Sequence, residues 1–243
     1  MSTVQALNAN AMVGVLGGMG PLATADFFNK VIAATHATSD AGHVPLLISS
    51  DPRIPSRPAA ILHGGLSPLP ALLAARDRLI AAGAVALVMP CNTAHHWHAQ
   101  LQAGCDVPFL SIVDAACQEV VQQVARGAPV GIIATRATLA ARLFDVQLTR
   151  LGYVPLLPDD PGLQDTVLAA IEGVKAGRVT QNGQPLEHAV QMLLDRGAAR
   201  VILACTEVPL ALDAIQSLLR VQCVDTTAAL ARACVDWWQG QMR

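Results

Sequence analysis

The sequence predicts an α/β protein made of two similar Rossmann-like domains with parallel sheets and an active site in the interdomain cleft. Aliphatic runs typical of buried strands alternate with helical patterns along the chain, as expected for parallel strands joined by right-handed crossovers. The alternation also repeats, because residues 13–17 (VGVLG) resemble residues 130–134 (VGIIA), and in each half a later strand ends in a cysteine. We therefore expect a first domain at 1–113 and a second at 114–220.

The individual elements follow in chain order from this alternation and from local start and stop signals. Pro21 suits the first position of a helix because proline has no N–H to lose, and Gly177 is a typical helix stop. Strands are predicted at residues 13–17, 44–49, 84–90, 109–113, 130–134, 153–157, 201–204 and 222–224. Helices are predicted over residues 21–34, 68–82, 93–102, 114–126, 138–151, 163–176, 185–196 and 208–219. The final segment, 221–243, is expected to return and pack on the first domain.

The composition limits the possible classes of function. The chain has 243 residues, of which 53% are hydrophobic and only 14% charged, so it can build sheets that helices cover on both faces. A formal net charge of −2 argues against nucleic acid or an anionic membrane as a partner. No secretory signal or membrane span is evident. Because the six cysteines lack CxxC spacing, we expect reduced thiols in a cytoplasmic protein.

A glycine-rich loop at residues 14–21 (GVLGGMGP) joins the first strand to the first helix. Glycines let backbone N–H groups approach an anion at a helix start, which predicts a carboxylate-binding loop that includes Met19 and Gly20. A tight turn without a ligand is the plainer alternative. Residues 18–23 also match the dinucleotide pattern GxGxxA. The acidic residue expected about 20 positions further on is not well placed, however, since Asp40 precedes the second strand.

An arginine-containing loop at residues 51–57 (DPRIPSR) follows the second strand. Its two prolines stiffen the backbone, and a guanidinium group binds a carboxylate with two parallel hydrogen bonds. Arg53 or Arg57 could therefore hold an acidic substrate. The alternative is that both are ordinary surface arginines.

Two cysteines occupy equivalent points of the repeat. Residues 84–95 (AVALVMPCNTAH) and 200–210 (RVILACTEVPL) each run from a buried strand through a cysteine into a helix. A helix N-terminus lowers the pKa of a thiol from its usual value of about 8.5, and the polar residues that follow Cys91 and Cys205 can cap the helix or bind a ligand. An inert, buried thiol is the interpretation we favour for the remaining four: Cys105, Cys117, Cys223 and Cys234.

Other polar residues have simpler explanations. His95 and His98 share a helical face, but no Asp, Glu or Cys completes a metal triad and HEXXH is absent, which favours helix capping or surface exposure. Lys175 lies near a helix end, where the helix dipole favours a cation. A pyridoxal Schiff base at this lysine has no other support in the sequence.

Together, the segments GVLGGMGP, DPRIPSR, MPCNTAH, VKAG, LACTEVPL and VDTT resemble the aspartate/glutamate racemase family, and its cofactor-independent aspartate racemases in particular. The resemblance extends over residues 13–238 in the family order. It implies two Rossmann-like domains, a homodimer, and racemisation of an amino acid by two cysteines. It also implies that neither a metal nor a pyridoxal cofactor takes part.

Carried over by position, the resemblance makes Cys91 and Cys205 the acid/base pair that interconverts L- and D-aspartate. Arg57 and Lys175 would hold the substrate carboxylates. The predicted substrate-binding set is completed by Met19, Gly20, Asn92, Thr93, Thr206 and Glu207. One departure concerns residues 54–58, which read IPSRP where aspartate racemases commonly read IPDRT. Arg57 keeps the basic position of this motif, but the acidic and hydroxyl residues beside it are replaced by Ser56 and Pro58. The preference for the side chain of the substrate therefore stays open.

Several alternatives remain at the level of the sequence. A glutamate racemase, a broad-specificity amino acid racemase and a diacid isomerase would use the same cleft. A nucleotide-binding oxidoreductase would use the glycine loop and would copurify with its cofactor. A catalytically silent amino acid-binding protein is disfavoured, because binding alone does not require a matched pair of thiols.

Overall fold

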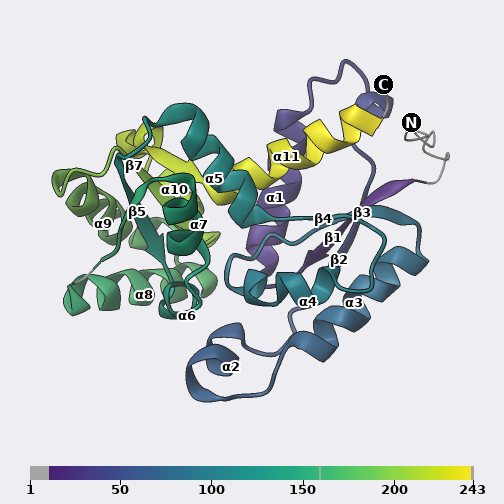
Figure 1. The fold of residues 1–243 in the computed structure, drawn as a ribbon, viewed down its shortest axis with the longest axis horizontal. Coiled ribbons are helices and arrows are strands. Elements are labelled where there is room, and N and C mark those ends of the chain that lie inside the picture. Colours follow the sequence, from purple (N-terminus) through teal and green to yellow (C-terminus); the bar gives the residue numbers. More distant parts are fainter. Residues whose placement is uncertain (1–10, 159, 242–243) are drawn as a thin grey trace.

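The computed structural model describes residues 11–158 and 160–241, which form two α/β halves, each with a four-stranded parallel sheet (Figure 1). The first sheet contains β1 (Met12–Gly17), β2 (Leu46–Ser50), β3 (Ala84–Val88) and β4 (Phe109–Leu110), in the order β2-β1-β3-β4. The second contains β5 (Pro129–Ala134), β6 (Val154–Leu156), β7 (Arg200–Ala204) and β8 (Cys223–Asp225), in the order β6-β5-β7-β8. The shared strand order confirms the predicted fold class and its repeat.

Helices connect the strands. The first half contains α1 (Pro21–Ala34), η1 (Asp40–Gly42), α2 (Arg57–His63), α3 (Leu69–Ala81), η2 (Thr93–Trp97) and α4 (His98–Gln102). They are followed by α5 (Ile112–Gln123), α6 (Arg136–Ala140), α7 (Leu143–Leu151), α8 (Pro161–Lys175) and η3 (Thr180–Asn182). The chain continues with α9 (Gly183–Asp195), α10 (Glu207–Ala214), η4 (Leu218–Gln222) and α11 (Thr226–Gln241).

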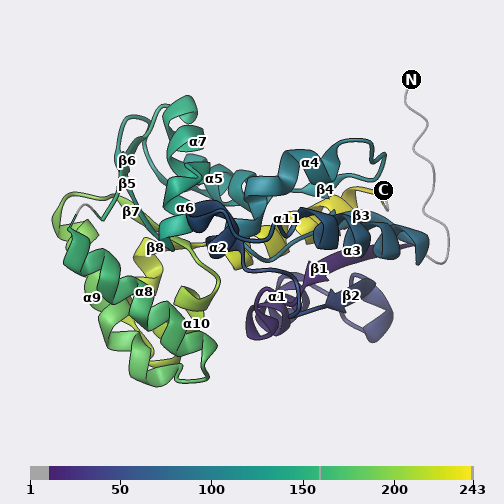
Figure 2. The ribbon, with the colours of Figure 1, turned by 90° about the horizontal axis from the view of Figure 1, so that it is seen from below.

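Both faces of each sheet are covered. Val13 and Val15 of β1 point into a core that α1, α5 and α11 share, whereas Leu16 on the other face packs with α3 and α4. In the second sheet Ile132 joins the shared core, and Ile133 packs under α8, α9 and α10. Figure 2 shows α8 and α9 along one side of this sheet and α5 and α7 along the other. Alternate residues of a strand point to opposite faces, which is why these strands are hydrophobic throughout.

Three predicted helices differ from the structure. The helix expected over 138–151 is broken at Arg142, which has a left-handed φ of 54° and separates α6 from α7. The helix expected over 93–102 begins as the 3₁₀ segment η2, and the one expected over 208–219 ends at Ala214, shortly before Gln216 with φ 53°. The DPRIPSR segment, interpreted as a stiff loop, leads directly into the unpredicted helix α2.

The C-terminal segment divides between the two halves. Its helix α11 packs on α1 and α5, but its strand β8 pairs with β7 in the second sheet, where Val201 is the partner of Cys223. The expectation that all of 221–243 packs on the first domain is therefore wrong for β8. An exposed edge at β7 would leave backbone N–H and C=O groups unpaired, and β8 satisfies them. Within the described residues, no helix combines the length and apolar character needed to cross a membrane.

Candidate active site

A small cavity lies where the two halves meet, and both repeat cysteines line it. Its walls are formed by Met19, Arg57, Pro58, Cys91, Asn92, Thr93, Thr135, Lys175, Cys205, Thr206 and Glu207. The free volume is about 30 Å³, which has room for roughly one or two water molecules.

The two cysteines reach the cavity from equivalent strand ends. Cys91 follows β3 just before η2, and Cys205 follows β7 just before α10. Both side chains are more than nine-tenths buried. Burial raises the pKa of the Cys91 thiol, and the Arg57 guanidinium and the Ala94 backbone N–H oppose that rise. Burial also raises the pKa of Cys205, to well above the usual value, and the neighbouring Glu207 carboxylate adds to the rise.

The glycine loop turns sharply after β1. Gly18 has φ 91°, and a Cβ atom there would lie 2.3 Å from the Asp51 backbone nitrogen, so only glycine fits the turn. Thr24 holds the loop, since its hydroxyl accepts from the Gly18 N–H at 2.9 Å and donates to the Gly20 carbonyl at 3.0 Å. Met19 then lines the cavity. Gly20 is not among the lining residues, but it faces the Glu207 carboxylate across a gap.

Arg57 is the first residue of α2 and is anchored by its own turn. Its Nη1 donates to the carbonyl oxygens of Ile54 and Pro55, each at 3.0 Å. Its buried Nε has no hydrogen-bond partner. A buried donor without an acceptor is costly, so this N–H has a hydrogen bond still to form. Arg53, the other arginine considered for this role, has a side chain 87% exposed and pairs with Asp51.

Lys175 comes to the cavity from the last turn of α8. Its Nζ lies 2.8 Å from Oε1 of Glu172, on the preceding turn. Burial alone would lower the pKa of Lys175, but the nearby Cys205, Glu172 and Glu207 together raise it. The amine therefore stays positively charged at neutral pH.

Asn92 is held in one orientation by a chain of hydrogen bonds. Thr226 donates its hydroxyl proton to the Leu203 carbonyl at 3.0 Å, so its oxygen accepts from Asn92 Nδ2, also at 3.0 Å. This fixes which end of the amide is the donor. Oδ1 of Asn92 is left buried without a partner, so the cavity wall contains one acceptor that lacks a donor.

A cluster of threonine hydroxyls joins the two halves. Thr93 lies 2.7 Å from Thr138 and 3.3 Å from Thr135, and these two are 3.0 Å from each other. Thr135 lines the cavity but was not predicted from the sequence, and neither was Pro58. The repeat contained a signal for Thr135, because aligning 13–17 with 130–134 places it opposite Gly18 of the glycine loop.

His95 is a structural residue beside the cavity. Its Nδ1 donates to the Cys91 carbonyl at 2.9 Å, and its Nε2 accepts from the Ile112 N–H at 3.0 Å. Burial, with the neighbouring His98, lowers the pKa of His95 to about 3. The neutral ring therefore links the turn at Cys91 to the start of α5.

Comparison with known proteins gives this cavity a family context. The family model of Asp/Glu/hydantoin racemases matches residues 16–234. The chain belongs to this racemase family. The resemblance found in the paired cysteine motifs is thereby confirmed, and the fold and the family agree.

Individual relatives of the racemase differ in their named substrates. This chain is 28% identical over 229 residues to a broad specificity amino-acid racemase of Bacillus subtilis. The alignment covers 93% of this chain and 97% of that protein. This chain is also 31% identical over 201 residues to a glutamate racemase of Ectopseudomonas mendocina, covering 80% and 68% of the two chains. The Picrophilus torridus aspartate racemase structure superposes with a TM-score of 0.82 at 27% identity, over 94% of each chain.

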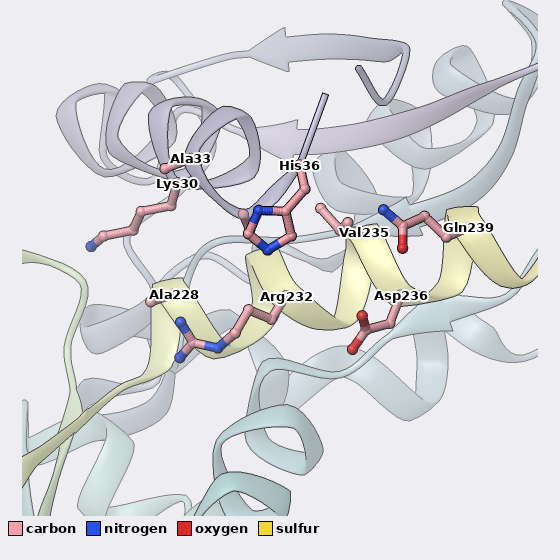
Figure 3. Close-up of a pocket in the computed structure, with 9 residues that line it drawn as sticks. Lys30, Ala33, His36, Ala228, Arg232, Val235, Asp236 and Gln239 are labelled. Carbon is pink, nitrogen blue, oxygen red and sulfur yellow. The ribbon is translucent and has the colours of Figure 1, made fainter. Parts of the chain in front are cut away.

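The racemase also has a larger cavity, of about 360 Å³, between α1 and α11 (Figure 3). Both of its lysine and arginine side chains are already paired: Lys30 with Asp26 and Asp225, and Arg232 with Glu119. None of the predicted site residues lines it. In the parts of the chain that the structure describes, no cluster of three or more His, Cys, Asp or Glu side chains could hold a metal ion.

Proposed function

We propose that this racemase interconverts L- and D-aspartate by a two-cysteine acid/base mechanism at Cα, without a cofactor. The observation that carries the proposal is that Cys91 and Cys205, from equivalent strand ends of the two halves, line one cavity. One thiolate can remove the proton from one face of a carbon while the other thiol delivers a proton to the opposite face. Reversal of the reaction exchanges the two roles.

The cations of the cavity favour an acidic substrate. Arg57 offers an N–H without a partner, and Lys175 offers a charged amine. Two cations can bind the two carboxylates of aspartate. The structural similarity to the Picrophilus torridus aspartate racemase supports the same choice.

The surroundings raise the pKa of both thiols, and the pKa of Cys205 is raised more strongly than that of Cys91. The Arg57 guanidinium opposes the effect of burial on the pKa of Cys91, whereas Glu207 reinforces it at Cys205. Cys91 therefore forms the thiolate more readily, and Cys205 is the thiol that holds its proton. The Thr93 hydroxyl would stabilise the negative charge that develops on the α-carboxylate. A single donor of this kind typically contributes about 100- to 1,000-fold to the rate.

A second candidate is a racemase that accepts several amino acids. It is favoured by the similarity to the broad specificity racemase of Bacillus subtilis, which extends over nearly the whole of both proteins. The replaced neighbours of Arg57 at Ser56 and Pro58 are consistent with an altered preference for the distal group.

The test is to incubate the purified, reduced protein with L-aspartate in D2O without added cofactor, beside L-glutamate and L-alanine. We expect D-aspartate with deuterium at Cα. Chiral chromatography measures the D-enantiomer, and proton NMR measures the loss of the Cα hydrogen. Absence of both D-aspartate and exchange would reject aspartate as a substrate. Equal rates on all three amino acids would instead favour the broad-specificity candidate.

We extend the proposal to a homodimer, as the family resemblance implies, and to a location in the cytoplasm, as the pattern of cysteines predicts. Light scattering should then give twice the mass of one chain in solution. A mass equal to one chain would reject the dimer without bearing on the chemistry.

A further inference from the structure

We propose that Glu207 binds the α-ammonium group of the substrate and thereby makes the cavity select amino acids over dicarboxylic acids that lack an amine. The inference rests on the proposed function, because it assigns a role at the same site. Glu207 is the first residue of α10 and is only 4% exposed. Its Oε2 accepts hydrogen bonds from Cys205 Sγ at 3.0 Å and from Thr206 Oγ1 at 3.1 Å.

This carboxylate is incompletely compensated. Both of its hydrogen-bond donors are neutral side chains, and among the described residues it forms no ion pair with a Lys, Arg or His. A buried carboxylate is expensive unless a cation pairs with it. The charged Lys175 amine is near enough to interact with Glu207 electrostatically, but its ion pair is with Glu172. In the described part of the chain, no cation therefore contacts the Glu207 carboxylate directly.

There is space for such a group beside Oε1. A Cβ atom built on Gly20 would have Oε1 of Glu207, at 3.7 Å, as its one neighbour within 4 Å. The gap between the glycine loop and Glu207 is thus open on the loop side. A small cation such as an ammonium group fits a space of this kind next to the carboxylate.

The charges around the cavity match an acidic amino acid group by group. Arg57 and Lys175 are the cations of the lining and Glu207 is its one anion. Aspartate has two carboxylates, which match Arg57 and Lys175, and one ammonium group, which matches Glu207. A dicarboxylate without the amine would leave Glu207 unpaired and would face it with like charge, which is an effective way to exclude a competitor.

The same contact connects recognition to proton transfer. In the free site, the thiol proton of Cys205 is directed at Oε2 of Glu207. A bound ammonium would compete for that carboxylate and release the thiol to turn toward Cα. The Cα–H bond then breaks as the Cys91 S–H bond forms, and the Cys205 S–H bond breaks as the new Cα–H bond forms.

The test compares two probes that differ only in the amine, racemic aspartate and succinate, by calorimetric titration. The wild type should bind aspartate more tightly than succinate. Glu207→Gln should weaken aspartate binding by roughly 10- to 100-fold, the value of a hydrogen bond to a charged group, and leave succinate binding unchanged or tighter. Glu207→Asp keeps the charge, so its affinity for aspartate should lie between those of the wild type and Glu207→Gln. Glu187→Gln, the same change on the outer surface by a different cavity, should alter neither.

The outcomes separate this inference from the proposed function. If the wild type binds succinate as tightly as aspartate, or if Glu207→Gln weakens both equally, Glu207 does not bind the amine, although racemisation can still hold. If aspartate binds with the predicted pattern but is not racemised, the ammonium site stands and the proposed chemistry fails. If neither probe binds the wild type, both are wrong for this substrate class.

Discussion

Cys91 and Cys205 differ from the other cysteines through their positions at strand ends in a shared cavity. Replacing either one with alanine removes a single sulfur atom and should leave the fold intact. We expect Cys91→Ala and Cys205→Ala each to lower the racemisation rate by about 100- to 10,000-fold, since each removes an acid/base group. Chiral chromatography measures the rate, and circular dichroism checks the fold.

Cys105 provides the matched control for these variants. It is half-buried, donates its thiol to the Val107 carbonyl and lies outside the cavity. Cys105→Ala should therefore racemise at nearly the wild-type rate. A Cys91→Ala or Cys205→Ala enzyme that matched this control would rule out the two-base mechanism.

His95 gives the fold a pH dependence of known sign. Its pKa is lowered from 6.5 to about 3 in the folded protein, so between these values the unfolded chain binds the extra proton. Stability from this residue is complete above pH 6.5 and is lost as the pH falls toward 3. The loss should be about 2 kcal/mol between pH 7 and pH 5.

Urea titrations at pH 7 and pH 5 measure this effect. His95→Asn cannot take up the proton, so its unfolding free energy should change less between the two pH values than that of the wild type. The variant should also be less stable at pH 7, because the ring makes two buried hydrogen bonds. An identical pH dependence in both proteins would contradict the assignment to His95.

At the scale of elements, the turn after β1 depends on one glycine. Gly18→Ala would combine a left-handed φ of 91° with a clash against the Asp51 backbone. Gly197 has nearly the same φ, 93°, but open space around its Cβ position. Gly197→Ala introduces only backbone strain and should lower the free energy of unfolding by about 1–2 kcal/mol. We expect Gly18→Ala to lower it by about 2 kcal/mol or more beyond that. Urea denaturation compares the two, and equal costs would show that the loop can shift.

Helix boundaries were predictable where a residue type enforces them. The start of α1 follows from Pro21, and both of its bounds agree with the structure. In contrast, α2 was missed because Pro52 and Pro55 suggested a loop. Pro58 lies in the first turn of α2, where proline is tolerated. The break at Arg142 has no glycine or proline to mark it. Packing of α6 and α7 on other elements determines it, and a single sequence does not contain that information.

At the scale of the whole molecule, the repeat made most of the site predictable. Equivalent cysteines after β3 and β7 imply equivalent places in two sheets of the same strand order, and the structure brings both to one cavity. The contacts across the halves were not predictable. Thr226 reaches Asn92, and Thr135 reaches Thr93, because the sheets face each other in a particular way. No local pattern encodes that arrangement.

Asp225 is the clearest of these cross-molecular contacts. Its buried carboxylate lies 2.8 Å from Lys30 of α1 and 3.0 Å from Arg220 of η4, and it accepts the Thr227 and Ala228 N–H groups at the start of α11. Burial would raise its pKa, but the two cations and the hydrogen bonds lower it overall. Its contribution to stability is therefore present above pH 3.8 and is lost as the pH falls below that value.

Asp225→Asn keeps an acceptor for the helix start but removes the charge between the two cations. We expect it to lower the free energy of unfolding by about 3 kcal/mol, as for other broken buried ion pairs. Asp213→Asn removes the other partner of Arg220, a carboxylate 51% exposed, and should cost less than about 1 kcal/mol. Urea denaturation at pH 7 compares the two. Similar costs would mean that Asp225 does not join the halves, and that the shared apolar core under α11 holds them together unaided.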